Sequence, residues 1–290
     1  MNKMRVAIAI SISMLMVCTV WAKPVDLKTD AASCRIETVG ARMISFAVSG
    51  EELLWNAEPI QLTADDWAHG GIPVCWPWFG VATNGLIHGT AWRSEFDVVQ
   101  HHAGKKRSTA ELLHETANAK LTLNLALTDS LTIEMETLNT GTNTLQLSYG
   151  FHPYLRVAER DKVRVEGVNG LSYEDDPSCP TPANGIWIGP LFITNNVDRI
   201  FDLGKARQAT LRLIDTVLNR TISVESIGAD AVNVWNPGEA KLCPGNVPDD
   251  SWRHFVCVEP ILVGGKRGSI SIAPGERRHL KMTIRLEHAE

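Results

Sequence analysis

Two residues capable of acid–base chemistry stand where strands are predicted to end. His152 lies in the stretch SYGFHPYLRV and precedes Pro153, which biases it toward extended backbone. Glu259 follows the apolar residues 255–258 and precedes Pro260. A carboxylate at the tip of an apolar strand is costly to bury unless it is ligated, paired or used, and an imidazole exchanges its proton near neutral pH. His152 is either catalytic or a satisfied structural histidine. Glu259 is either ligated, paired or used, or a rim residue hydrated by solvent.

An aromatic-rich stretch provides a second candidate surface. Residues 70–80 read GGIPVCWPWFG, and His88 follows eight positions later. Glycine and proline at that density prevent a regular helix, so Trp76, Trp78 and Phe79 are held on irregular backbone. The stretch is either a proline-stiffened turn that packs aromatics into the core, or one wall of a pocket that stacks a flat ligand such as a sugar ring.

Several other chemistries lack their motifs. The chain has no Gly-x-Ser-x-Gly elbow, no His-Glu-x-x-His pair, no phosphate-cradling glycine loop and no dinucleotide fingerprint. The cysteines after residue 22 show none of the close paired spacings of zinc or thioredoxin-type sites. Their number is odd, so at least one thiol stays unpaired within a monomer, and we interpret them mainly as small buried hydrophobic residues. These cysteines are Cys34, Cys75, Cys179, Cys243 and Cys257.

The elements that must position these residues are predicted to be strands. Apolar residues alternate with polar or small ones with a period of two, most clearly over residues 121–127 and 131–135. Beyond the first 22 residues, no segment sustains an apolar stripe at helical spacing for three turns, and glycine and proline punctuate the chain. No linker rich in Pro, Ser or Gly divides it. The sequence therefore predicts an all-β fold, with one large antiparallel β-sandwich over residues 23–290.

Two turn signals predict hairpins. Residues 139–143, with Gly141 at the turn, separate the strand that ends near residue 138 from the apolar positions of residues 145–149. Near the end of the chain, Pro274-Gly275 separates two further alternating segments. We expect each turn to join two paired strands.

The first 22 residues differ in kind from the rest. MNKMR is basic, residues 6–20 are almost wholly apolar or small, and Val20-Trp21-Ala22 resembles a small-residue cleavage site. The apolar run is shorter than the ~20 residues that a spanning helix needs. We therefore expect a cleavable signal peptide over residues 1–22 rather than an uncleaved anchor. The mature protein would be exported, periplasmic or secreted, without stable membrane association.

The overall composition favours a small-molecule partner. The chain has 290 residues, of which 44% are hydrophobic and 21% charged, and its net charge is -5. This is an ordinary globular balance, and no long basic block provides an electrostatic footprint for nucleic acid. We expect a monomer.

Six short motifs follow one another between residues 67 and 260. They are Gly-Gly-Ile-Pro-Val-Cys-Trp-Pro-Trp-Phe-Gly, His-Gly-x-Ala, Phe-His-x-Tyr at 151–154, Asp198-Arg199-Ile200, Val-x-Val-Trp-Asn-Pro and Val-Cys-Val-Glu. In content and order, this series resembles the glucose-6-phosphate 1-epimerase group, also called hexose-6-phosphate mutarotases, of the aldose 1-epimerase family. A single motif is weak, but six in register are specific.

The resemblance implies a galactose-mutarotase-type sandwich that interconverts the α and β anomers of an aldohexose or a hexose 6-phosphate, without metal or organic cofactor. It assigns His152 and Glu259 as the catalytic pair. Opening a pyranose ring needs a base for the anomeric hydroxyl proton and an acid for the ring oxygen, so we expect a Glu259 carboxylate and a protonated His152. The expected sugar-binding set is His69, Trp76, His88, Arg93 and Asp198, with Trp78 or Trp235 as further apolar faces. For Trp235 we favour core packing over sugar stacking.

Two positions depart from the phosphate-handling members of that group. Those members carry arginine directly before Gly-Gly and at the end of His-Gly-Phe-Ala-Arg, where this chain has His69 and Trp92. Arg93 stands one step further on, which in an extended strand would direct it to the opposite face. Imidazole and indole lack the permanently charged fork with which arginine binds phosphate. We therefore expect a weaker preference for hexose 6-phosphates over free hexoses.

Two other classes of function remain open on the sequence. A non-catalytic carbohydrate-binding sandwich would keep the tryptophans but would not need His152 and Glu259 at one point in space. A glycoside hydrolase or lyase would need a second acidic or tyrosine partner near the anomeric carbon. Only Asp198 is offered by a matched motif, and there it resembles a binding residue.

We expect the mature protein to begin near Lys23, because the basic, apolar and small-residue regions occur in the order that signal peptidase reads. Intact-mass analysis of exported protein measures this directly. Residues 1–22 still attached in a soluble exported fraction would show that the prediction is wrong.

Overall fold

The computed structural model describes residues 23–57, 69–83, 85–177, 179, 181–239, 250–265 and 268–288. The expected signal peptide and Cys243 lie outside these residues. No helix in the described ranges is long and apolar enough to cross a membrane.

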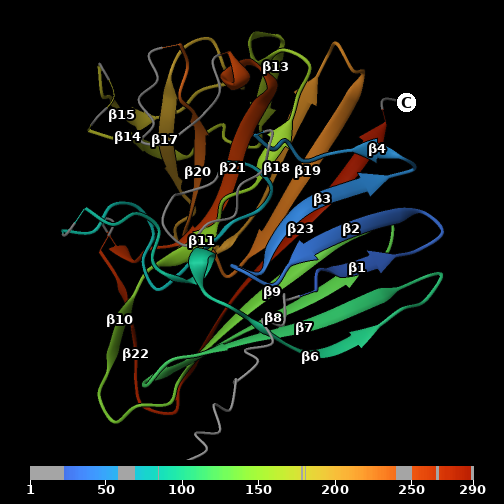
Figure 1. Ribbon diagram of the computed structural model, residues 1–290. Coiled ribbons are helices and arrows are strands. Elements are labelled where there is room, and N and C mark those ends of the chain that lie inside the picture. Colours follow the sequence, from blue (N-terminus) through green and yellow to red (C-terminus); the bar gives the residue numbers. More distant parts are fainter. Residues whose placement is uncertain are drawn as a thin grey trace, which may run out of the picture.

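Two large antiparallel sheets dominate the described chain, as Figure 1 shows. The first has eight strands in the order β15-β14-β17-β20-β21-β11-β5, with β12 also paired to β21. The second has nine strands in the order β16-β13-β18-β19-β23-β9-β8-β7-β6. A four-stranded sheet, β1-β2-β3-β4, and a two-stranded sheet, β10-β22, accompany them. The all-β prediction is confirmed.

The strand bounds show how short many elements of the first sheet are. The first sheet contains β5 (Val74–Cys75), β11 (Tyr149–Phe151), β12 (Tyr154–Arg156), β14 (Ser172–Asp175), β15 (Asn184–Ile186), β17 (Val197–Asp202), β20 (Ala231–Asn236) and β21 (Phe255–Leu262). The second contains β6 (Asp97–His102), β7 (Ser108–Glu115), β8 (Ala119–Leu127), β9 (Ser130–Asn139), β13 (Val163–Glu166), β16 (Leu191–Phe192), β18 (Gln208–Asp215), β19 (Arg220–Ile227) and β23 (Arg277–His288). The smaller sheets contain β1 (Val25–Lys28), β2 (Ala32–Glu37), β3 (Arg42–Val48), β4 (Glu51–Glu52), β10 (Leu145–Leu147) and β22 (Ile270–Ile272). Three short 3-10 helices are η1 (Ala91–Arg93), η2 (Arg160–Lys162) and η3 (Ser251–His254).

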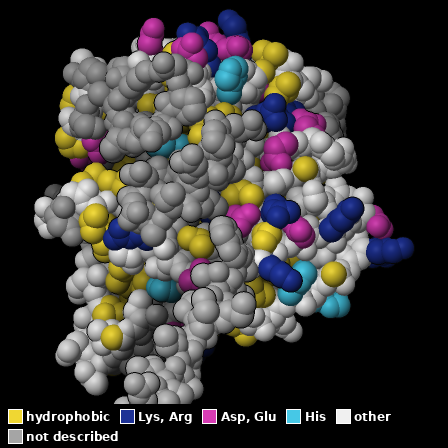
Figure 2. All heavy atoms as spheres, in the orientation of Figure 1, with side chains coloured by type: hydrophobic (Ala, Val, Ile, Leu, Met, Phe, Trp, Pro, Cys, Tyr) yellow, Lys and Arg dark blue, Asp and Glu magenta, His cyan; other side chains and the backbone are white. Residues whose placement is uncertain are grey.

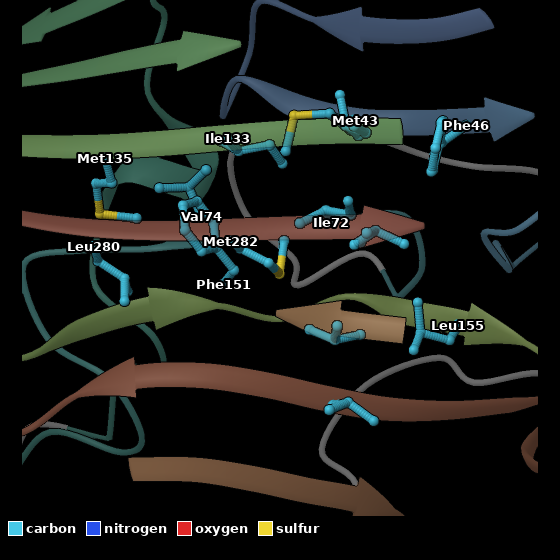
Figure 3. Packing of buried hydrophobic residues seen from close by; sticks show 14 of the residues in the cluster. Met43, Phe46, Ile72, Val74, Ile133, Met135, Phe151, Leu155, Leu280 and Met282 are labelled. Atoms are coloured by element: carbon cyan, nitrogen blue, oxygen red, sulfur yellow. The ribbon is translucent and has the colours of Figure 1, made fainter. Parts of the chain in front are cut away.

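One hydrophobic core lies between the two large sheets, which makes the fold a β-sandwich. Figure 3 shows Val74 and Phe151 of the first sheet packed with Ile133 and Met282 of the second. The central strands contribute alternate residues to this core, because successive side chains point to opposite faces, whereas β6 and β15 are exposed throughout. The first sheet therefore has a second face that is directed away from the core.

The two turns predicted as hairpins connect sheets instead. β9 continues through residues 140–144 into β10, but β10 pairs with β22 rather than with β9. β23 pairs with β9 and β19, so β22 and β23 are not partners. Asn139 ties the two connections together, since its Nδ2 donates to the carbonyl oxygens of Asn143 and Ile272, both at 2.8 Å. Both hairpin predictions are wrong, although the strands and turns themselves are present.

The surface carries both signs of charge. Figure 2 shows Lys and Arg side chains interspersed with Asp and Glu among the described residues of the face that it draws. Exposed ion pairs such as Arg35 with Asp26 and Arg212 with Glu287 belong to this pattern.

Candidate active site

Strand register brings three polar side chains together on the outer face of the first sheet. Asn233 of β20 stands directly opposite Glu259 of β21. Asp198 of β17 stands opposite Trp235, two residues along β20 from Asn233. Residues two apart on a strand share a face, so all four side chains point the same way. The intervening residues Val232, Val234, Val256 and Val258 are buried in the core.

His152 reaches this face from the gap between β11 and β12. Its backbone N–H donates to the carbonyl oxygen of Pro73 at 3.1 Å, and the preceding Phe151 lies in the core. The imidazole Nε2 lies 3.6 Å from Oε2 of Glu259. His152 is 5% exposed and Glu259 is 0% exposed. The structure thus brings together the two residues that the sequence predicted as a catalytic pair.

Asn233 links the two carboxyl groups of the site. Its Nδ2 donates to Oδ1 of Asp198 at 3.1 Å and to Oε1 of Glu259 at 3.4 Å. One amide group therefore fixes the base candidate and the binding candidate relative to each other. Sequence reasoning missed Asn233, which occupied the variable position of the Val-x-Val-Trp-Asn-Pro motif.

Aromatic rings enclose the imidazole of His152. Tyr154 stacks on it, with ring centroids 4.8 Å apart, and Trp235 meets it edge-on at 5.5 Å. The hydroxyl of Tyr154 lies 2.9 Å from Nδ1 of His69, and that imidazole lies parallel to the indole of Trp235. His69 therefore belongs to the site, as predicted. Trp235 is half-buried beside both histidines and packs against the buried cluster of Tyr154, Phe255 and Cys257, in line with the core-packing interpretation.

His88 is held at the site by an unusual backbone conformation. Its φ is +54°, and its Nδ1 accepts a hydrogen bond from the backbone N–H of Gly80 at 3.2 Å. Nε2 therefore carries the ring proton of the neutral imidazole. The ring meets that of His152 edge-on, with centroids 5.2 Å apart. Gly89 is required next to it, since a Cβ there would lie 2.0 Å from the carbonyl oxygen of Trp76.

Two predicted binding residues lie elsewhere. Trp76 is 2% exposed, belongs to the core and donates its Nε1–H to Thr137 Oγ1 at 3.1 Å. Strand alternation explains this, because Cys75 takes the outer face and leaves its neighbour the inner one. Arg93 ends the 3-10 helix η1 rather than extending a strand, and its guanidinium lies 5.6 Å from the Trp92 ring centroid. No contact among the described residues joins Arg93 to the His152–Glu259 pair.

Burial controls the protonation of the pair. Desolvation, followed by the charge of Asp198, raises the pKa of Glu259 well above its ordinary value, and the hydrogen bond from Asn233 opposes this shift. Desolvation, followed by the neighbouring His88 and His69, lowers the pKa of His152 well below its ordinary value. Burial and His69 lower the pKa of His88 to about 3. Burial therefore shifts the pKa of both groups toward their uncharged forms, whereas the sequence-based expectation is a Glu259 carboxylate and a protonated His152.

The chain is similar to known proteins over most of its length. A family model described as Aldose 1-epimerase matches residues 24–285. An Escherichia coli K12 protein with the provisional name of a glucose-6-phosphate 1-epimerase is 29% identical over 260 residues, covering 85% of this chain and 84% of that protein. A Salmonella typhimurium protein with the same provisional name is 30% identical over 237 residues, or 77% of each chain.

Solved structures show the same fold. A crystal structure titled as a provisional mutarotase from Salmonella typhimurium has a TM-score of 0.80 at 23% identity, covering 91% of this chain and 90% of that one. A galactose mutarotase-like protein from Lactobacillus casei has a TM-score of 0.71 at 16% identity, covering 91% and 100%. The predicted galactose-mutarotase type of sandwich is confirmed.

We expect Glu259→Gln to have a higher free energy of unfolding than the wild type, by a margin that grows as the pH rises. The pKa of Glu259 is higher in the folded protein than in the unfolded chain, so the native protein loses stability as the pH climbs from about 4.5 through the folded value. The amide removes that loss. The gain near pH 8 should be of the order of a few kcal/mol, because each unit by which the folded pKa exceeds the unfolded value contributes about 1.4 kcal/mol.

Urea unfolding of the wild type and the variant at about pH 5 and about pH 8 measures this gain. Glu134→Gln is the matched control, because Glu134 lies at the surface of the other sheet beside His279. An equal gain at both pH values, or the same pH dependence in Glu134→Gln, would contradict the expectation.

Proposed function

The chain belongs to the aldose 1-epimerase family, and we propose that it interconverts the α and β anomers of an aldohexose with His152 and Glu259 as its acid–base pair. Its class as an isomerase follows from the family match and the relatives. One observation carries the assignment of the pair, namely the 3.6 Å separation of the imidazole and the carboxyl group on a buried face. The non-catalytic and hydrolytic alternatives are not needed, since the relatives are named as epimerases.

Mutarotation requires one proton to leave and one to arrive. The base removes the proton of the anomeric hydroxyl, the ring oxygen gains a proton, and the C1–O5 bond breaks to give the open-chain aldehyde. Rotation about C1–C2 and reclosure deliver the other anomer, with the acid and base roles reversed. Glu259 is proposed as the base toward O1 and His152 as the acid toward the ring oxygen.

The pKa shifts of Glu259 and His152 bear on which of the two residues carries the proton at the start of ring opening. A protonated Glu259 with a neutral His152 is the arrangement that ring opening leaves behind, so it matches the complex of the open-chain sugar. Ring opening starts with the proton on His152 and with Glu259 as the carboxylate. Oε2 and Nε2 are 3.6 Å apart, which is longer than a hydrogen bond, so the two groups would exchange the proton through the sugar oxygens rather than share it directly. The pair must hold one proton in total, and its two apparent pKa values belong to the pair rather than to either residue.

The other residues of the face would hold the sugar and orient the pair. Asp198 would accept hydrogen bonds from sugar hydroxyl groups, and His88 would donate a hydrogen bond from its Nε2–H. Trp235, half-buried beside His152, offers an apolar ring face. Asn233 is a positioning residue, because its amide holds the Glu259 carboxyl group through Oε1 and leaves Oε2 directed at His152.

The substrate is proposed to be a free hexose more than a hexose 6-phosphate, although the relatives' names refer to glucose 6-phosphate. His69 stands in the site as an imidazole hydrogen-bonded to Tyr154. Trp92 is 8% exposed and donates its Nε1–H to the carbonyl oxygen of Gly89 at 3.0 Å. The guanidinium of Arg253, in η3, stacks on the Trp252 ring, 4.2 Å from the ring centroid.

Export remains part of the proposal. It is supported by the basic, apolar and small-residue order of residues 1–22. The mature chain would then act as a monomer on a small sugar outside the cytoplasm, where free hexoses are the more plentiful substrates.

Glu259→Gln and His152→Ala are each expected to lower kcat for mutarotation by ~100-fold or more, the usual contribution of a general acid or base. Polarimetry on freshly dissolved α-glucose measures the rate, with spontaneous mutarotation as the baseline. The matched controls are Glu134→Gln and His279→Ala, because these residues form a glutamate–histidine pair at 3.1 Å on the surface of the other sheet. Full activity in either site variant would refute the assignment.

Glucose 6-phosphate is expected to show at most a weak advantage over glucose in kcat/KM, and His69→Arg should raise that ratio more than tenfold. A charge-assisted hydrogen bond to phosphate contributes roughly 1.5–3 kcal/mol. His69→Arg carries the test, and Trp92→Arg is added to it only if the double variant folds, because Trp92 is buried. His101→Arg on the exposed strand β6 controls for a general effect of charge. A large phosphate preference in the unmodified protein would show that these two positions do not decide it.

A further inference from the structure

A cysteine lies beside the proposed catalytic pair. Cys257 precedes Glu259 by two residues on β21, so both side chains point to the outer face. Cys257 pairs across the sheet with Tyr154, two residues after His152. The Cys257 sulfur, a ring nitrogen of His152 and a carboxyl oxygen of Glu259 all lie within 4.8 Å of one another, and all three residues are buried. The sequence did not indicate this cluster, because His152 is remote along the chain from Cys257 and Glu259.

We propose that His152, Cys257 and Glu259 form a binding site for Zn²⁺ or a similar thiophilic divalent cation, which excludes the sugar while it is bound. The ion is not a cofactor of the isomerase. It would lie between His152 and Glu259 and coordinate the imidazole and carboxyl groups that proton transfer needs.

The donor set suits zinc. Zn²⁺ binds thiolate sulfur, imidazole nitrogen and carboxylate oxygen in a tetrahedron, and open sites use three protein ligands. Ideal bond lengths place the nitrogen and oxygen ligands about 3.3 Å apart and the sulfur about 3.6 Å from the oxygen. The observed separation of His152 Nε2 from Glu259 Oε2 is 3.6 Å. The sulfur would move by roughly an ångström, which a small side-chain rotation provides.

A second observation also points to a cation. Glu259 is 0% exposed, and its Oε2 accepts no hydrogen bond from the residues that the structure describes. Asp198 lies close by and adds a second carboxyl group. His152 contributes a ring nitrogen that lies within 4.8 Å of the other two ligand atoms. A divalent ion would replace the thiol and carboxyl protons, which leave to solvent, and would offset the negative charge that remains.

Asn233 of β20 donates to the other oxygen of Glu259, Oε1, and would stay in place as an outer partner of the ligand. The rings of His88 and Tyr154 pack against the His152 imidazole and would hold its orientation. The buried Arg42 guanidinium acts electrostatically on His152 and is the one cationic group that opposes a bound ion among these described neighbours.

Cd²⁺ titration of the full mature protein in metal-free buffer tests the site, because a Cd²⁺–thiolate bond absorbs in the ultraviolet. We expect a charge-transfer band that saturates at one equivalent. Cys257→Ser should abolish the band and weaken Zn²⁺ binding, measured by calorimetry, by about tenfold or more. Cys34→Ala, which removes a buried cysteine in β2 of another sheet, should leave both unchanged.

The proposal is overturned if the wild type shows no band, or if Cys257→Ser binds Zn²⁺ as tightly as the wild type. Cys257→Ala serves as a second variant if the serine variant does not fold. Saturating glucose should weaken Zn²⁺ binding, and unchanged binding in its presence would refute the exclusion of sugar. The Cd²⁺ band and its stoichiometry do not depend on turnover, so they test the metal site alone. Mutarotation in metal-free buffer tests the proposed function alone.

Discussion

The pairing of β20 with β21 is the constraint on which the rest of the site depends. It sets Asn233 opposite Glu259, and the alternation of the two strands leaves their valines no place except the core. A slip of one residue would turn Glu259 inward and expose Val258 on the outer face. Burial of the valines therefore fixes the strand register, and the register fixes where Asn233 and Glu259 lie. Packing on one side of the sheet is what gives precision to the chemistry on the other.

Loss of water on this outer face gives the pair its chemical character. At ordinary exposure a glutamate would be ionised at neutral pH, and an imidazole, with a pKa near 6.5, would be partly protonated. Here both pKa values move toward the neutral forms, because burial penalises each charge. Asn233 partly offsets the penalty for Glu259, and no other side-chain donor to that carboxyl group is found in the described chain. The same loss of water underlies both the proposed proton exchange and the proposed metal site.

The sequence was most informative where local patterns coincide with tertiary demands. Period-two alternation predicted the strands, and the ends of apolar strands predicted His152 and Glu259 as a pair. It failed where partners are chosen over long distances. The turn after Asn139 has hairpin chemistry, but β10 finds its partner in β22. Trp76 looked like a ligand wall, but a two-residue strand directs its ring inward. Asn233 and the placement of the proton needed strand register and burial, neither of which a single sequence displays.

The site is assembled from segments that are remote along the chain, and this has a consequence for how the protein folds. β5 joins β11, and β11 joins β21, so the face that holds residues 69 to 259 closes only after very long loops have been closed. Such long-range pairing is slow, whereas the β6–β7–β8–β9 meander can form from neighbouring strands. A half-folded chain would already possess four of the nine strands of its second sheet and none of the face that holds His152 and Glu259. In refolding, the recovery of sugar turnover would therefore mark the final closure of the sandwich rather than the first appearance of β-structure.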